Sequence, residues 1–199
     1  PGSEYPIAMR RRGVNGTDEV VLDVNLEADG HAYYNVGDYD ISPDDALLAF
    51  SEDTVSRRQY TIRFRDLATG DDLPDRIAGV DPAIVWADTG TTILYIEQDP
   101  ETLLGVRVRA HTLGTDPTAD PVIFENDDDA YYMDIRVGRS KRHLFIDLES
   151  TDTTETLAAP TGDLALSFTP VVPRSDGHEY HVDDLDDTFV MRTNLGAPN

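Results

Sequence analysis

The sequence predicts an all-β protein organised as a partial, open β-propeller, and three observations lead to this fold class. Short runs rich in Val, Ile, Thr, Tyr and Phe are bounded by Gly, Pro, Asp or Asn, as is typical of strands. No long segment shows the i, i+3, i+4 spacing of apolar residues that indicates an amphipathic helix. One strand–turn–strand element recurs along the chain at a spacing of about 45 residues.

The recurring element has an apolar anchor, a polar turn and a second strand that ends in three apolar positions. Four short strands per unit of about 45 residues is the arrangement of propeller blades. A β-sandwich also has many short strands, but it would not repeat one element at this interval. The four copies are Ile41–Phe50, Trp86–Tyr95, Val137–Ile146 and Val182–Met191.

Further strand patterns between the copies complete three units. They are Gln59–Leu67 with Leu73–Ala78, Gly105–Thr112 with Val122–Glu125, and the weaker pair Glu155–Ala158 with Leu166–Val171.

The chain therefore holds about three full four-stranded blades and two half blades. Residues 5–24 are expected to form two outer strands and residues 180–192 two inner strands. Because an open propeller leaves strand edges unpaired, we expect self-association through the cut edges. The expected units within a single propeller fragment, residues 1–199, are residues 1–33 (partial), 34–79, 80–126, 127–176 and 177–199 (partial).

The first half blade is predicted to be a hairpin of Tyr5–Met9 and Val20–Val24. The dipeptide Asn15-Gly16 between them favours a tight turn. Asn15-Gly16-Thr17 is also formally a glycosylation sequon, but the chain shows no secretory leader, so the turn is the better explanation.

Composition excludes several function classes. The 199 residues contain no cysteine, which excludes a disulfide scaffold, a thiol nucleophile and Cys-ligated metal sites, and fits a cytoplasmic protein. No apolar run is long enough for a transmembrane helix, so no membrane is expected as a partner. Sixteen basic residues against 39 acidic ones give a net charge of −23, with Lys141 the only lysine. Such a surface repels nucleic acid and favours cationic partners, although solubility alone also explains it.

Motifs that would carry chemistry are missing. Gly138-Arg139-Ser140-Lys141-Arg142 lacks the second glycine of a nucleophile elbow and falls in a predicted turn. His178 and His181 are expected on opposite faces of an extended segment, so they do not predict a metal site. The acidic runs Asp127–Asp129 and Asp183–Asp187 lack the ligand order of a calcium loop and are expected to be solvated turns.

The remaining aromatic residues suggest packing, and no phosphate-binding pattern suggests catalysis. We expect Trp86 and the pairs Tyr33-Tyr34 and Tyr131-Tyr132 to pack between blades. No glycine-rich phosphate loop or dinucleotide fingerprint occurs. From the residues alone, we predict no catalytic residue, no metal site and no cofactor in this chain.

One basic cluster is the exception. Arg57 and Arg58 are adjacent on a very acidic chain, and a planar guanidinium is well suited to bind a carboxylate. Two interpretations stay open: the arginines neutralise carboxylates of their own blade, or they form an inter-domain or gating contact.

Several sequence segments resemble oligopeptidase B (protease II), within the prolyl oligopeptidase family of serine peptidases. The resemblance runs in order along nearly the whole chain and is weakest over residues 161–170. The strings that carry it are Val20–Asn25, Ser56–Tyr60, Ile62–Gly70, Val85–Ala87, Thr102–Leu104, His111–Thr115, Asp129–Tyr132 and His178–Tyr180.

The resemblance implies a seven-bladed propeller that caps a separate α/β-hydrolase domain carrying the Ser-Asp-His triad. It also implies cleavage of short peptides after Arg or Lys by the whole enzyme. No triad or substrate-pocket residue can be transferred onto this chain, which is expected to be inactive by itself and to wall and gate the substrate chamber. Arg57 and Arg58 would then belong to the contact with the hydrolase domain, and cationic peptides would be the substrates. The alternative is a propeller that acts only as an interaction module, without a hydrolase.

Overall fold

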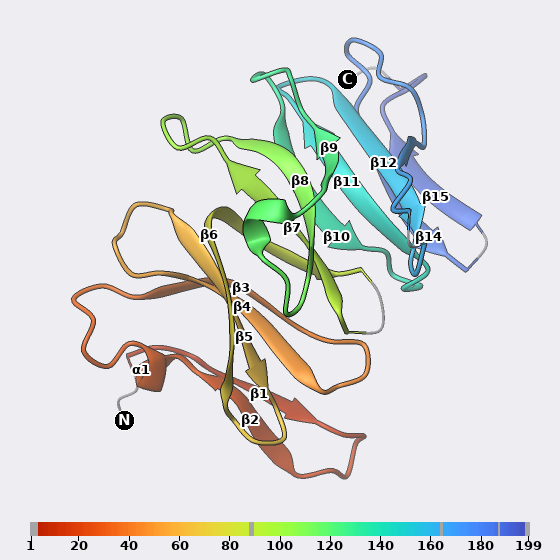
Figure 1. Cartoon of the computed structure of the whole chain (residues 1–199). Helices are drawn as coiled ribbons and strands as arrows, with labels where there is room; N and C mark the ends of the chain where they lie inside the picture. Colours follow the sequence, from red (N-terminus) through yellow and green to blue (C-terminus); the bar gives the residue numbers. More distant parts are fainter. Residues whose placement is uncertain (1–3, 88–89, 164, 187, 198–199) are drawn as a thin grey trace.

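The computed structural model describes residues 4–87, 90–163, 165–186 and 188–197. Over these residues the chain is almost entirely β-structure, with one short α-helix and one short 3-10 helix (Figure 1). The strands are β1 Ile7–Arg11, β2 Asp18–Asp23, β3 Asn35–Ile41, β4 Leu47–Asp53, β5 Tyr60–Asp66, β6 Asp72–Trp86, β7 Thr92–Gln98, β8 Gly105–Thr112, β9 Val122–Glu125, β10 Tyr132–Val137, β11 His143–Glu149, β12 Thr154–Pro160, β13 Thr169–Pro170, β14 Tyr180–Leu185 and β15 Thr188–Thr193; the helices are α1 Val24–Glu27 and η1 Pro117–Ala119.

The strands form four antiparallel sheets that follow one another in chain order (Figure 1). The sheet orders are β1-β2, then β3 to β9, then β10 to β13, then β14-β15. The seven-stranded sheet arises because β6, 15 residues long, pairs with β5 through its first part and with β7 through its last part. One strand thus closes one four-stranded unit and opens the next. The all-β, unclosed architecture predicted from the sequence is confirmed.

Three copies of the recurring hairpin turn share a closing hydrogen bond and a positive φ in their described residues. In each, the amide at the start of the turn donates to the carbonyl that begins the next strand: Ser42 to Leu47, Ala87 to Thr92 and Gly138 to His143, at 2.8 to 2.9 Å. The fourth residue of each turn has a positive φ: 63° at Asp45, 109° at Gly90 and 62° at Lys141. The repeat seen in the sequence is therefore a repeat of local conformation.

The hydrophobic core is divided into four clusters, and each lies between neighbouring units of the arc. This arrangement is expected because a sheet that lies between two others buries apolar side chains on both of its faces. The largest cluster joins β7 and β8 to β10 and β11 through side chains such as Leu94, Ile96, Leu144 and Ile146, all buried. Trp86 is buried in the neighbouring cluster, and its indole N–H donates to the carbonyl of Asp40 at 3.2 Å. Its predicted packing between blades is confirmed.

Three local predictions were wrong. The first hairpin does not close at Asn15-Gly16: Arg11 pairs with Asp18, so six residues form the loop and the positive φ lies at Gly13. Val24 begins α1 rather than ending a strand, because the side chain of Asp23 accepts a hydrogen bond from the Asn25 amide and caps a helical turn.

The third wrong prediction concerns the tyrosine pairs. Tyr34 and Tyr131 are buried, but their neighbours Tyr33 and Tyr132 are exposed, so only one tyrosine of each pair packs in the core.

Candidate interaction site

Arg57 and Arg58 lie on the β4–β5 loop, and a buried carboxylate fixes the conformation of this loop. Asp53, 1% exposed, accepts the backbone N–H of Val55 at 2.8 Å through Oδ1. Its Oδ2 accepts the backbone N–H groups of Arg57 and Arg58 at 3.0 and 2.8 Å. Ser56 and Arg58 have φ values of 59° and 54°, which non-glycine residues rarely adopt. The backbone of the loop is thus built around one carboxylate.

Both arginines are exposed. Within residues 4–87, 90–163, 165–186 and 188–197, neither guanidinium forms an ion pair with a carboxylate. A direct ion pair with a carboxylate of their own blade is thus absent from the described residues, and the neutralising interpretation stays a prediction. The inter-domain or gating role remains a proposal.

A cavity of about 420 Å³ lies beside this loop. It is bordered by the β4–β5 loop on one side and by the β7–β8 loop, through Pro100 and Leu103, on the other. A second hollow of about 530 Å³ continues over Gly79 towards β8 and shares Gln98 with the first. The groove between two neighbouring units is therefore open next to the two arginines.

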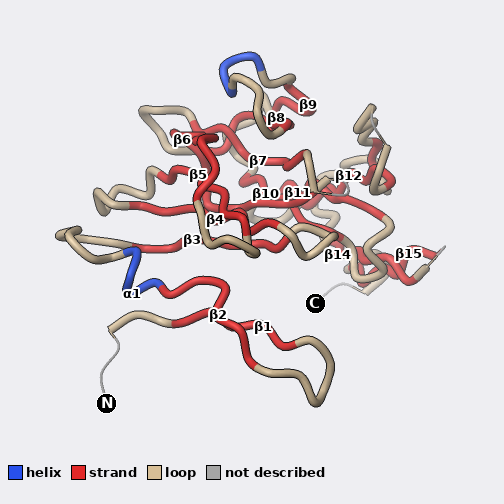
Figure 2. The backbone as a smooth tube through the Cα atoms, turned by 60° about the horizontal axis from the view of Figure 1, so that its bottom comes forward, coloured by secondary structure: helices blue, strands red, loops and turns tan. Residues whose placement is uncertain are grey.

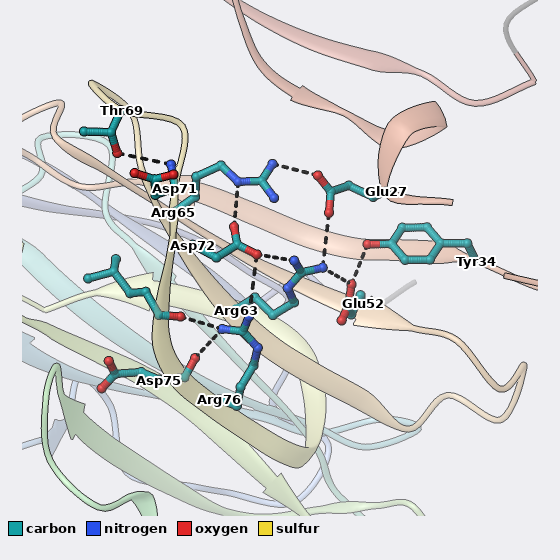
Figure 3. Close-up of polar contacts among 11 residues, drawn as sticks. Glu27, Tyr34, Glu52, Arg63, Arg65, Thr69, Asp71, Asp72, Asp75 and Arg76 are labelled. Carbon is teal, nitrogen blue, oxygen red and sulfur yellow. Dashed lines mark hydrogen bonds and ion pairs between the residues drawn. The ribbon is translucent and has the colours of Figure 1, made fainter. Parts of the chain in front are cut away.

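A cluster of charges lies on the outer part of the same unit (Figure 3). Arg63 Nη1 donates to Glu52 Oε2 at 2.8 Å and to Glu27 Oε2 at 3.1 Å. Arg65 Nη1 donates to Glu27 Oε1 and its Nε to Asp72 Oδ1, both at 2.7 Å.

Burial would raise the pKa of Asp72, but hydrogen bonds from Arg65 and Arg63 outweigh burial and lower it. Because Arg63 and Arg65 are paired with carboxylates of the same chain, the cluster is structural.

Carboxylates gather along the innermost strands of three consecutive units. Asp38 and Asp40 lie on β3, Asp81 on β6 and Asp134 on β10. Partial burial raises the pKa of each of them. The charges of Asp134 and Asp38 also raise the pKa of Asp81, so the three strands bring these groups within electrostatic range. Four carboxylates on the first strands of three consecutive units thus lie close enough to influence one another.

Sequence reasoning missed one buried polar cluster. His111 on β8 is 0% exposed, and each ring nitrogen faces a carboxylate: Nε2 lies 3.2 Å from Asp75 Oδ1 and Nδ1 lies 3.0 Å from Asp120 Oδ1. Tyr95 donates its hydroxyl to Asp120 at 3.0 Å. The only sequence signal was a histidine in the predicted strand Gly105–Thr112, which does not reveal partners 36 and 9 residues away.

Ser140, which the sequence analysis weighed as a nucleophile, does not form a nucleophile–base pair with the nearby His143. Ser140 donates its hydroxyl to Asp184 Oδ2 at 2.5 Å, and His143 Nδ1 lies 2.9 Å from the same oxygen. Both groups therefore bind one carboxylate, and the serine lacks the neighbouring base that activates a nucleophile. His178 bonds to Thr193, and the described parts of the chain hold no group of side chains fit to bind a metal ion.

One acidic run was misjudged. Asp184 is not part of a solvated turn: it is 0% exposed on β14 and caps the preceding β10–β11 turn through the amide and hydroxyl of Ser140. Asp183 accepts the amide of Arg139 in the same contact, whereas Asp187 lies outside the described residues. The sequence does not reveal this burial, because the residues that bind the acidic run lie 41 to 44 positions earlier in the chain.

Among the residues that the structure describes, no helix is long and apolar enough to cross a membrane.

The fold and the repeat define the class of protein. The profile of the family "prolyl oligopeptidase, N-terminal beta-propeller domain" matches residues 1–199, and the chain belongs to this family. The resemblance proposed from the sequence is confirmed.

The individual relatives are peptidases. The chain is 42% identical over its full length to dipeptidyl aminopeptidase BI of Pseudoxanthomonas mexicana, and 31% identical over 98% of its length to Protease 2 of Moraxella lacunata. The solved structure of oligopeptidase B from Leishmania major superposes with a TM-score of 0.85 at 28% identity, over 90% of this chain and 25% of that one. The chain spans 30% and 29% of the lengths of the two curated relatives.

Proposed function

We propose that this chain walls and gates the substrate chamber of a serine endopeptidase that resembles oligopeptidase B and cleaves short peptides after Arg or Lys. The partner of the propeller is then an α/β-hydrolase domain of the same protein, which supplies a serine nucleophile, a histidine base and an oxyanion hole. The family membership and the structural similarity to oligopeptidase B support the first half of this proposal. The proposed preference for cleavage after Arg or Lys rests on the negative charge of the chain.

The observation that carries the specificity is the row of carboxylates on the inner edge. Asp38, Asp81 and Asp134 come from three consecutive innermost strands, and their charges interact. A chamber wall with this charge attracts peptides that carry Arg or Lys and raises their encounter rate, most strongly at low ionic strength. Relatives named as a dipeptidyl aminopeptidase and as Protease 2 differ in named activity, so this test of specificity is needed.

The test compares an Arg-containing peptide with a neutral analogue of equal length in the full-length protein. We expect kcat/KM for the cationic peptide to fall with added salt, and Asp38→Asn, Asp81→Asn and Asp134→Asn together to remove most of this dependence. A matched control, Asp71→Asn, changes a carboxylate on the outer β5–β6 turn. If the salt dependence is absent, or persists unchanged in the triple variant, the steering role is wrong.

Arg57 and Arg58 are proposed to contact the hydrolase domain. The rigid loop and the lack of a carboxylate partner in the described structure support this role, because exposed cations held in a fixed conformation are suited to bind an external anion. Reversing both charges (Arg57→Glu with Arg58→Glu) is expected to change peptide kinetics and domain closure, whereas Arg139→Glu on an exposed turn is not. Unchanged kinetics and closure in the double variant would remove the proposal.

The second candidate is a propeller that serves only as an interaction module. Its discriminating observation is whether the reading frame continues past Asn199 into a Gly-x-Ser-x-Gly motif on a strand-to-helix turn. The cytoplasmic location, the absence of nucleic-acid partners and self-association through cut edges stay predictions.

A further inference from the structure

We propose that Asp53 is a positioning residue for the contact between the propeller and the hydrolase domain, because its buried carboxylate fixes the backbone that carries Arg57 and Arg58. This inference rests on the proposed function, in which the two arginines contact that domain. It adds a residue that touches neither the substrate nor the partner and acts through the conformation of its loop.

Asp53 supplies the hydrogen bonds that hold residues 54–59, the loop between β4 and β5. Figure 2 shows β4 and β5 side by side in the main body of strands, where they pair with each other, so the loop starts from a fixed base. Beyond the paired residues, the amides of Val55, Arg57 and Arg58 donate to the carboxylate of Asp53. Within the described part of the chain, residues 54–59 form no further hydrogen bond.

Packing against neighbouring residues adds little to this support. One side of the loop borders the cavity of about 420 Å³, to which Thr54, Val55 and Gln59 contribute. Val55 is the only apolar residue of the loop, and it is 56% exposed. A loop that faces an open cavity and buries no apolar side chain depends on its hydrogen bonds for a fixed conformation.

The backbone of the loop also needs this carboxylate to offset its strain. Ser56 and Arg58 have φ values of 59° and 54°, and a non-glycine residue in this region costs free energy. The N–H groups that converge on Asp53 offset this cost, because hydrogen bonds to a charged acceptor are stronger than those to a neutral one. When the carboxylate is lost, we expect the loop to relax and both guanidinium groups to lose their fixed position.

The next two units carry weaker forms of the same cap. Asp99, which follows β7, is partly exposed and accepts two amides of its loop at 2.9 and 2.8 Å. Ser150, which follows β11, accepts one amide at 3.2 Å. Asp53 is 1% exposed and accepts three amides. The loop with two adjacent arginines therefore has the most complete cap of the three, which favours a role for its rigidity beyond closing a turn.

The first measurement tests the loop itself in the full-length protein. Asp53→Asn keeps the size of the side chain but replaces one accepting oxygen by an amide group that cannot accept. We expect hydrogen exchange of residues 54–59 to become about tenfold faster or more, because hydrogen bonds to a charged group are lost, while exchange in β7 changes by less than about twofold. Trypsin should also cleave faster after Arg57 or Arg58, because proteolysis follows the opening of a loop.

The second measurement tests positioning by a double-mutant cycle on peptide kinetics. Arg57→Ala with Arg58→Ala removes both guanidinium groups. If Asp53 acts through them, Asp53→Asn should change kcat/KM by about twofold or more when the arginines are present and have no further effect when they are absent. The matched control is Asp99→Asn, which loosens the next loop and should have the same effect in both backgrounds.

The outcomes separate this inference from the proposed function. Normal kinetics in the arginine double variant would refute the contact and the positioning role together, although faster exchange in Asp53→Asn would still show that Asp53 fixes the loop. Altered kinetics in that variant, combined with an Asp53→Asn effect that is absent or equal in both backgrounds, would refute the positioning role and leave the contact standing. Unchanged exchange of residues 54–59 in Asp53→Asn would also overturn the positioning role.

Discussion

Replacing His111 by phenylalanine tests whether the buried Asp75–His111–Asp120 cluster stabilises the junction between two blades. His111→Phe keeps an aromatic ring beside Phe64, whose centroid lies 6.0 Å away, so the loss of packing volume is small. It leaves the carboxylates of Asp75 and Asp120, 5% and 3% exposed, without their shared partner. The effect measured is therefore mainly that of two buried carboxylates that each lose a hydrogen-bond partner, while Asp75 keeps the amide of Gly114 and Asp120 keeps the hydroxyl of Tyr95.

The expected magnitude follows from this burial. Leaving a buried hydrogen-bonding group without its partner costs about 1–3 kcal/mol. For a chain of this length, about 2–4 °C of Tm is lost per kcal/mol, so Tm should fall by about 2–12 °C. Adding Asp120→Asn to His111→Phe replaces one of the two carboxylates by a neutral amide and should restore part of the loss.

The assay is equilibrium denaturation by urea followed by circular dichroism, with thermal melts in parallel. The control is His181→Phe, at an exposed position on β14, where we expect little change. A loss below about 1 kcal/mol for His111→Phe, or one equal to that of the control, would refute the reasoning that this cluster carries a large share of junction stability.

Three further predictions concern the other contacts. A Cβ atom at Gly138 would overlap Asp184 Oδ1 and lie 2.8 Å from the Phe145 ring. Gly138→Ala should therefore lower the free energy of unfolding, measured by urea denaturation, by about 1–3 kcal/mol. An unchanged free energy of unfolding would contradict this close packing. Burial raises the pKa of Asp81, so the ionised carboxylate destabilises the fold at pH values above the folded pKa, and this cost disappears at pH values below the unfolded pKa. Asp81→Asn should therefore raise the free energy of unfolding at about pH 7 but not at about pH 3. An equal effect at both pH values would contradict this sign. The exposed apolar side chains Phe189 and Val190 on the terminal strand β15 should make the 199-residue chain self-associate in light scattering, whereas a monomer at all concentrations would argue against adhesive ends.

Much of the fold could be predicted because the signals are local. Small and polar residues between apolar runs predict the turn at Ser42–Ala46 and its two copies, and all three turns have the same closing hydrogen bond in the structure. The first hairpin shows the limit of this logic. Asn15-Gly16 favours a tight turn, yet the register that buries Leu22 requires a loop of six residues.

The candidate sites were predicted less well, because their partners lie far apart in sequence. Arg57 and Arg58 were found as a pair, but nothing local showed that Asp53 uses its carboxylate to hold their backbone. Asp184 was assigned to solvent since four of five residues in its run are acidic, whereas its partners Ser140 and His143 belong to the preceding blade. Such contacts depend on how blades face each other.

The sequence by itself determined the strands, the repeating turns, the strongly negative charge and the family, because each is encoded in residue order over a few positions or one repeat length. Only the tertiary structure decided which charged groups meet: Glu27 with Arg63 and Arg65, His111 with Asp75 and Asp120, and Asp184 with Ser140. The physical reason is that burial and distance, which fix the strength of a charge interaction, are set by the packing of one blade on the next.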